Sequence, residues 1–240
     1  VVHCEINQEL SEIVAHNFKE MTINNVVIYA KNGLEFLHHS TKKYDAIYID
    51  PSRRNDTKGK VFLLNDCHPN VPEHLDFLLS KSNQILVKNS PLLDISQTIA
   101  ALKFVKEVHI VAINNDVKEL LFLIEKKYEK SITIKTLNFH KNSPQHFKFT
   151  YQKEAISSYS KPLTYLYEPN AALLKSGGFH AISEQLNLDK IHQHTHLYTS
   201  KDILEEFPGR KFKITHINRY HKKEILKHLT TKKANVTTRN

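Results

Sequence analysis

The chain has 240 residues, with 34 Lys and Arg against 25 Asp and Glu, which gives a net charge of +9. Apolar residues make up 40% of it, enough for a packed core, so a wholly disordered chain is excluded. No apolar run approaches the roughly 18 residues of a membrane span, so we expect no membrane partner. The two cysteines, Cys4 and Cys67, exclude a disulfide framework and a cysteine-based zinc site.

The excess of positive charge favours a polyanionic partner, because phosphates attract basic surfaces and release counterions on binding. The alternative is a Lys- and Asn-rich composition that only keeps the protein in solution. Few cysteines and no charged-then-apolar leader predict a cytoplasmic protein. The chain begins at Val1 and its single methionine is Met21, so we expect that it lacks its natural start.

The first 115 residues alternate short apolar runs with helical patterns. Helices are predicted at 8–21, around 34–37, at 72–79 and at 94–103, with a polar loop at 52–71. Strands are predicted at 1–5, 26–30, 44–50, 84–88 and 108–113. Strands separated by helices indicate a Rossmann-like α/β fold with a parallel sheet, whose ligands bind at the carboxyl ends of the strands. The polar residues at those ends are Glu5, Asn32, Asp50 and Asn89.

The second half of the chain has a weaker helical pattern. Residues 117–127 predict one more helix, and 132–137 and 147–151 predict antiparallel strands before a linker at 157–162. Beyond it we expect short helices at 171–174 and 182–186, a strand end at 197–200, a strand at 211–217 and a helix at 222–229. These elements predict a small second α/β domain.

The polar strand ends form a recognisable order. Glu5 ends the first strand, Asn32 and Gly33 follow the second, and the third ends in Asp50-Pro51 followed by Ser52-Arg53-Arg54. This order resembles the class I S-adenosylmethionine-dependent methyltransferases. The resemblance implies that Glu5 binds the ribose of S-adenosyl-L-methionine, that Asn32 and Gly33 lie at its adenine, and that Asp50 borders its methyl group. It also implies that Asp50 and Pro51 form the motif at the reaction centre.

Each of these residues also has a plain structural interpretation. An acid such as Glu5 often ends a strand in solvent, and Asn32 before Gly33 is typical of a turn. Asp50 is the most specific, because a residue before proline is driven into an extended conformation that aims its side chain into the crevice.

The segment 44–54 is similar to a bacterial group of methyltransferases that carry a C-terminal THUMP-like domain. Segments of the second half that resemble this domain are 167–170, 175–178, 197–200, 207–210 and 233–240. The resemblance implies a partial methyltransferase domain at 1–128, a ferredoxin-like insert and linker at 129–161, and a THUMP-like domain at 162–240.

The chain departs from this group at its ends. In the group, a further strand and a glycine-rich loop that cradles the cofactor precede the strand that begins here, whereas this chain has only five glycines and no Gly-x-Gly. Its last segment stops where the group's domain continues. We therefore expect a fragment truncated at both ends, in which cofactor binding and activity are weak or lost.

The expected chemistry is methyl transfer to nitrogen or oxygen. Such a displacement needs positioning and the exclusion of water, and no metal. Methylation of a pyrimidine carbon usually needs a cysteine nucleophile, and Cys67 lies in the loop after the third strand rather than after the fourth. Asp50 could accept a hydrogen bond from a target amine or orient a target hydroxyl, so the sequence leaves the target atom open.

Basic residues indicate the substrate. Arg53 and Arg54 flank the expected reaction centre, and basic residues recur in the second domain around Tyr220: Arg210, Lys211, Lys213, Arg219 and Lys222. Basic side chains interleaved with aromatic ones can follow a phosphate backbone and stack on a base. Resemblance to THUMP domains implies an RNA substrate, ribosomal or transfer RNA. The alternative is a solvated, lysine-rich face.

Histidines offer a last candidate site, because His192, His194 and His196 alternate and would share one face of a strand. No Asp or Cys nearby completes a closed site, so we predict no metal. The main hypothesis is a methyltransferase that acts on RNA. The alternatives are a non-catalytic RNA-binding protein with a degenerate cofactor site, and a small-molecule methyltransferase with an incidental basic face.

Overall fold

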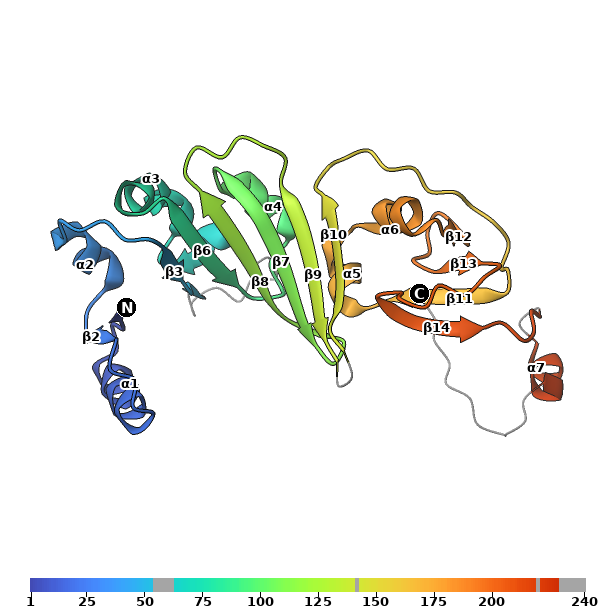
Figure 1. Cartoon of the computed structure of the whole chain (residues 1–240), viewed down its shortest axis with the longest axis horizontal. Helices are drawn as coiled ribbons and strands as arrows, with labels where there is room; N and C mark the ends of the chain where they lie inside the picture. The colour runs from blue at the N-terminus through green and yellow to red at the C-terminus, as the bar shows by residue number, and fades with distance from the viewer. Residues whose placement is uncertain (54–62, 141–142, 219–220, 229–240) are drawn as a thin grey trace. The chain divides into compact units, whose positions relative to one another are not determined.

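The computed structural model describes residues 1–53, 63–140, 143–218 and 221–228 (Figure 1). Its helices are α1 (Gln8–Glu20), α2 (Gly33–His39), α3 (Val71–Lys81), α4 (Ile95–Ala101), α5 (Ala171–Ser176), α6 (Phe179–Leu186), α7 (Lys222–His228) and the 3₁₀ turn η1 (Leu64–Asp66). The strands up to the middle of the chain are β1 (Val2–Cys4), β2 (Val27–Tyr29), β3 (Ile47–Ile49), β4 (Ser52–Arg53), β5 (Cys67–His68), β6 (Gln84–Asn89), β7 (Val105–Ile113) and β8 (Asp116–Glu125). The later strands are β9 (Thr133–Phe139), β10 (Gln145–Thr150), β11 (Tyr165–Pro169), β12 (Asp189–Lys190), β13 (Tyr198–Ser200) and β14 (Gly209–Lys213).

Within the described ranges, the strands pair in four sheets. The largest has the order β10-β9-β7-β8-β6-β3, a second has the order β12-β13-β11-β14, and the pairs β1-β2 and β4-β5 stand alone. The chain divides into two compact units. Unit 1 comprises residues 1–109 and 119–132, and unit 2 comprises residues 110–118 and 133–240.

The first part of unit 1 is a β-α-β segment. β1 and β2 run parallel, with Val2 opposite Val27, and α1 connects them. The side chain of Asn7 caps α1 by accepting a hydrogen bond from the N–H of Leu10. The helix begins at residue 8 as predicted, but its apolar side chains are largely exposed, Ile13 at 52%.

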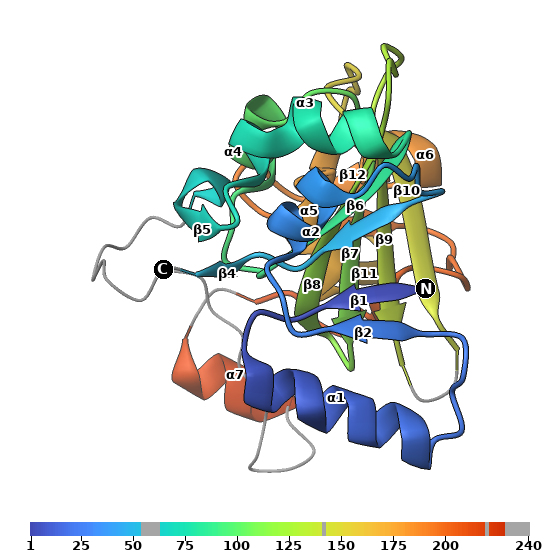
Figure 2. The ribbon, with the colours of Figure 1, turned by 90° about the vertical axis from the view of Figure 1, so that its left-hand side faces the viewer.

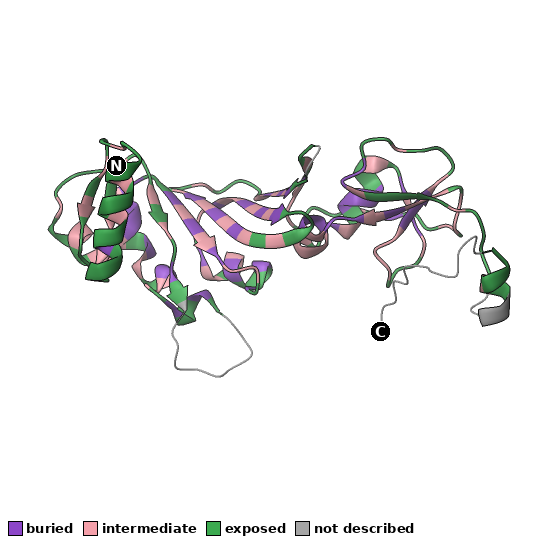
Figure 3. Cartoon of the chain, turned by 90° about the horizontal axis from the view of Figure 1, so that it is seen from below, coloured by how far each residue is buried: buried purple, intermediate pink, exposed green. Residues whose placement is uncertain are grey.

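The core of unit 1 lies on one face of β6 and β8. β6 pairs with β3 in parallel and with β8 antiparallel, so β6 has a neighbour on each side. Ile85 and Val87 are fully buried, whereas Leu86 and Lys88 are only partly covered. Buried and less buried bands alternate along the central strands in Figure 3. The helices α3 and α4 lie over one face (Figure 2), with Leu75 and Leu78 of α3 almost completely buried. The opposite face, which carries Lys88, is the more open one.

The structure corrects one predicted element, because residues 116–125 form the strand β8 and not a helix. Asn114 and Asn115 adopt positive φ angles of 50° and 65°. Two consecutive left-handed residues between strands are the geometry of a tight hairpin turn, and asparagine tolerates it better than most side chains do. From Leu120 to Glu125 the side chains alternate between buried and partly covered, so a period of two outweighs the helical pattern.

Unit 2 contains a core built on the sheet β12-β13-β11-β14. Its buried cluster comprises Phe147, Tyr167, Leu173, Ala181, Ile182, Leu188, Tyr198 and Phe207. β9 and β10 pair antiparallel, as predicted. Asn170 caps the start of α5, because its side chain accepts a hydrogen bond from the N–H of Leu173.

Smaller differences occur elsewhere. The predicted loop at 52–71 contains β4, η1 and β5, and β4 pairs antiparallel with β5. The predicted strand at 211–217 begins earlier, at Gly209, and ends at Lys213. Residues 192–197 lie outside regular strands, so His192, His194 and His196 do not share a strand face as their alternation suggested. Among the described residues, no helix is both long enough and apolar enough to span a membrane.

Candidate functional site

The carboxyl end of β1 positions Glu5. Its backbone N–H donates to the carbonyl of Tyr29 at the end of β2, over 3.1 Å. Its carboxylate oxygen Oε1 accepts a hydrogen bond from the backbone N–H of Asn7, over 2.7 Å, just before α1. One such bond uses only part of the acceptor capacity of a carboxylate, so Glu5 can still accept from vicinal hydroxyls.

The start of α2 positions Asn32 and Gly33. Oδ1 of Asn32 accepts hydrogen bonds from the N–H of Leu34 at 2.9 Å and from that of Glu35 at 3.4 Å, so this side chain is a helix cap. A Cβ at Gly33 would lie 3.6 Å from Cβ of Cys4, the residue before Glu5. The structure therefore brings Glu5, Asn32 and Gly33 together at one end of the β1-β2 pair.

Asp50 follows β3 and forms an ion pair with a neighbouring strand. Parallel pairing of Ile49 with Val87 sets Asp50 beside Lys88, and Oδ2 of Asp50 lies 2.6 Å from Nζ of Lys88. Their side chains are 50% and 27% exposed, so solvent and ligands reach both. Pro51, the next residue, is buried, which fixes the backbone that carries the Asp50 carboxylate.

Two further residues complete this charged cluster. Oε1 of Glu119, on β8, lies 4.0 Å from Nζ of Lys88. The hydrogen bond that Lys88 donates to Asp50 is the main reason that the pKa of Lys88 is raised above its ordinary value. The pKa of Tyr48 is also raised, first by burial and then by the negative charge of Asp50. We call Tyr48, Asp50, Lys88 and Glu119 the Asp50 cluster.

The sequence did not single out Lys88, Glu119 or Tyr48. Lys88 was visible only as the last residue of a predicted strand, and its partner depends on the register between two strands. Asn89, which the sequence placed at a strand end, is 3% exposed, and its Nδ2 has no hydrogen-bond partner among the described residues. Because side chains alternate along β6, Asn89 belongs to the face opposite Lys88.

The predicted substrate-binding residues are only partly described. Nε of Arg210 donates to Oε2 of Glu168 at 2.9 Å, and Nζ of Lys211 lies 3.1 Å from Oε2 of Glu205, so acidic neighbours offset both charges. Lys213 is exposed at the end of β14. The remaining predicted residues lie outside the described part of the chain or have undescribed side chains: Arg53, Arg54, Arg219 and Lys222.

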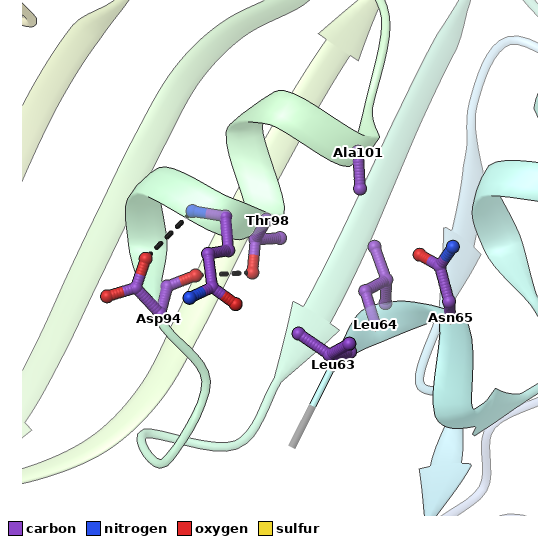
Figure 4. A pocket seen from close by; sticks show the side chains of 7 residues that line it. Leu63, Leu64, Asn65, Asp94, Thr98 and Ala101 are labelled. Carbon is purple, nitrogen blue, oxygen red and sulfur yellow. Dashed lines mark hydrogen bonds between the residues drawn. The ribbon is translucent and has the colours of Figure 1, made fainter. Parts of the chain in front are cut away.

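A pocket of about 210 Å³ lies beside α4 and η1 (Figure 4). Its lining residues are Leu63, Leu64, Asn65, Asp94, Gln97, Thr98 and Ala101. Asp94 uses its polar atoms within α4, because Oδ1 accepts from the N–H of Gln97 and its carbonyl accepts from Oγ1 of Thr98, at 2.8 and 2.7 Å. The exposed surface of the pocket is mostly apolar, and none of the sequence-predicted residues that the structure describes lines it.

The histidines lie in the connection between β12 and β13. The N–H of His194 donates to Nδ1 of His192 at 3.2 Å, and the ring of His196 stacks on Phe179 at 3.5 Å between centroids. Within the described ranges, no three His, Cys, Asp or Glu side chains gather as metal ligands.

We compared this mixed α/β fold with known protein families and solved structures. The sequence model of a ferredoxin-like domain family matches residues 165–208, a range inside the stretch 162–240 for which we predicted a THUMP-like domain. The chain is similar to the crystal structure of a proposed methyltransferase from Porphyromonas gingivalis W83, with 31% sequence identity and a TM-score of 0.81. The similarity covers 95% of this chain and 59% of that protein, so this chain spans about three fifths of its relative's length. No curated protein sequence matches the chain.

Proposed function

We propose that this chain is part of an S-adenosyl-L-methionine-dependent methyltransferase that acts on RNA. The observation that carries the proposal is the structural similarity to the P. gingivalis protein, which extends over 95% of this chain at 31% identity. Similarity of this extent supports a shared activity more strongly than a shared fold alone, because one fold hosts many functions. The polar residues at the ends of β1, β2 and β3 support the proposed methyl transfer.

The residues at the end of the β1-β2 pair fit a nucleoside. Glu5 has acceptor capacity left beyond its bond to Asn7, as two adjacent ribose hydroxyls require. Gly33 has no side chain to cover its backbone, and it is partly exposed at the start of α2. On this proposal Glu5 binds the ribose, and Asn32 and Gly33 line the adenine side. The bound cofactor supplies a methyl group on a positively charged sulfur.

Asp50 and Pro51 are proposed to act at the reaction centre. Buried Pro51 holds the chain rigid after β3, and the half-exposed carboxylate of Asp50 is a hydrogen-bond acceptor for the target group. Positioning of this kind supplies much of the acceleration of a bimolecular displacement.

RNA is the proposed substrate because β14 presents positive charge beside an exposed aromatic ring. Phe212 is 43% exposed, and the guanidinium of Arg210 lies 5.6 Å from its ring centroid. Lys213 follows on the same strand. An exposed ring next to basic side chains can stack on an unpaired base while the charges contact phosphates. Because Glu168 and Glu205 offset part of this charge, we expect a modest salt dependence of binding.

The test is incubation of the full-length protein with methyl-labelled cofactor and total cellular RNA. We expect label in the RNA, and we expect Asp50→Ala to abolish it without changing the far-UV circular dichroism spectrum. The matched control is Glu125→Ala, which removes a carboxylate that is paired with Lys106 at 2.7 Å on the same sheet and has no proposed role. Label that persists in Asp50→Ala would remove Asp50 from the mechanism, and an unlabelled RNA pool would refute the RNA substrate.

A further inference from the structure

The Asp50 cluster presents a donor and an acceptor side by side. A lysine ammonium has three N–H donors and no acceptor. One donor of Lys88 serves Asp50 at 2.6 Å, and Glu119 at 4.0 Å is beyond hydrogen-bond distance. The carboxylate of Asp50 likewise keeps acceptor sites beyond the one that Lys88 occupies. Both side chains are partly exposed, and Lys88 lies on the more open face of β6.

This pairing matches one class of methyl acceptor. A hydroxyl oxygen can accept from the Lys88 ammonium while its proton is donated to the Asp50 carboxylate. The amino group of a nucleobase donates but has no free lone pair to accept, so it would match Asp50 alone. In addition, a nitrogen gains positive charge as it attacks the methyl group, which a nearby ammonium opposes. An oxygen that loses its proton gains negative charge, which the ammonium stabilises.

We propose that the methyl-accepting atom is a hydroxyl oxygen, which in RNA is the ribose 2′-hydroxyl. This inference rests on the proposed function and narrows its target. The hydroxyl oxygen forms the bond to the methyl carbon, the carbon–sulfur bond breaks, and its electron pair stays on sulfur, which becomes a neutral thioether. The hydroxyl proton passes to Asp50 and then to water. Lys88 stabilises the oxygen as its proton leaves, and Glu119 and Tyr48 border the pair from β8 and β3.

The product decides the target atom. RNA labelled by the full-length protein is hydrolysed in alkali, which cleaves every linkage except the one on the 3′ side of a 2′-O-methyl ribose. We expect the label in alkali-resistant dinucleotides, and no label in DNA of the same sequence, which lacks the 2′-hydroxyl. Label in mononucleotides that carry a methylated base would overturn this inference and leave the proposed function standing. RNA without any label would overturn both.

Variants of Lys88 test its proposed role in methyl transfer. We expect Lys88→Met to lower kcat about 100-fold, the scale of one lost transition-state donor, with the KM for the methyl donor unchanged. Lys88→Arg should restore part of the rate, because it keeps a charged donor. The control is Lys106→Met, which breaks an ion pair of similar length, 2.7 Å, and should leave kcat within twofold. Equal kcat values for Lys88→Met and Lys106→Met would contradict the role of Lys88.

A measurement without turnover checks the pair itself. In the 240-residue chain, the side-chain NMR signal of Lys88 is titrated in the wild type and in Asp50→Asn. We expect the pKa of Lys88 to fall in the variant, because the hydrogen bond to Asp50 is the main cause of its rise. The titration of Lys106 should not change. If the pKa of Lys88 were the same in the wild type and in Asp50→Asn, the pair would not form in solution, and this result would refute the inference.

Discussion

Gly209→Ala is expected to destabilise unit 2 strongly. Gly209 opens β14 and pairs with Pro169 of β11. A Cβ at Gly209 would overlap the carbonyl oxygen of Glu168 and lie 2.7 Å from Cε1 of Phe207. Both contacts are far shorter than the 3.4 Å at which ordinary contacts begin. The carbonyl belongs to the backbone and cannot rotate away, so the two strands must separate.

The energy follows from what that separation disturbs. Overpacking a well-packed site costs about 1–3 kcal/mol. Two hydrogen bonds would be strained, from the N–H of Asn170 to the carbonyl of Pro208 at 3.0 Å and from Nε2 of Gln145 to the carbonyl of Gly209 at 3.3 Å. Each is worth about 1 kcal/mol. The expected loss is therefore about 3–5 kcal/mol, a large share of the roughly 5–15 kcal/mol that stabilises a typical domain.

The control is another glycine in the same unit. Gly177 has a φ of 72°, and a Cβ added there would meet no described atom within 4 Å beyond its chain neighbours. Gly177→Ala therefore meets only the left-handed backbone and should lose about 1 kcal/mol. Urea unfolding is followed by circular dichroism and by tyrosine fluorescence, because the chain has 10 tyrosines and no tryptophan. If Gly209→Ala lost no more stability than Gly177→Ala, the close approach of β11 and β14 would be refuted.

Three further predictions concern single side chains. Asn32→Ala should lower the free energy of unfolding by about 1 kcal/mol in thermal melts, because α2 loses its cap, and an unchanged melt would contradict the capping bonds. Glu5→Gln in the full-length protein should weaken binding of the methyl donor by about 1–3 kcal/mol, as calorimetry can measure, whereas unaltered affinity would exclude Glu5 from the ribose site. Lys190 is 2% exposed and burial lowers its pKa, so between that lowered pKa and the ordinary lysine value of 10.5 the unfolded chain binds more protons and stability rises with pH. Lys190→Met should remove the contribution of this side chain to the slope, and a wild-type slope in the variant would argue against the buried charge.

Local patterns were sufficient to predict the elements whose two faces differ in polarity or whose ends carry clear signals. The helices α1, α3 and α4 lie close to their predicted ranges, since each begins at an Asn or Asp cap before an apolar pattern. The prediction of a helix at 117–127, where the structure has the strand β8, was wrong for a physical reason. The apolar residues of β8 occupy both faces, so they fit a helix as well as a strand, and the deciding signal was the adjacent pair Asn114-Asn115.

The same difference between local signals and long-range strand pairing applies to the candidate site. Asp50 and Pro51 could be predicted as a strand end because their signal lies within a few residues, whereas the ion pair of Asp50 could not, because it depends on which residue of β6 stands opposite. Pairing of Ile49 with Val87 places Lys88 at that position. A shift of one residue in this register would turn Lys88 to the face covered by α3 and α4 and set Asn89 beside Asp50. The predicted helix at 117–127 also hid Glu119, which reaches Lys88 only because β8 pairs with β6 as a strand. The chemistry proposed for Asp50 therefore depends on strand register, a property of the folded sheet that no single segment of the sequence contains.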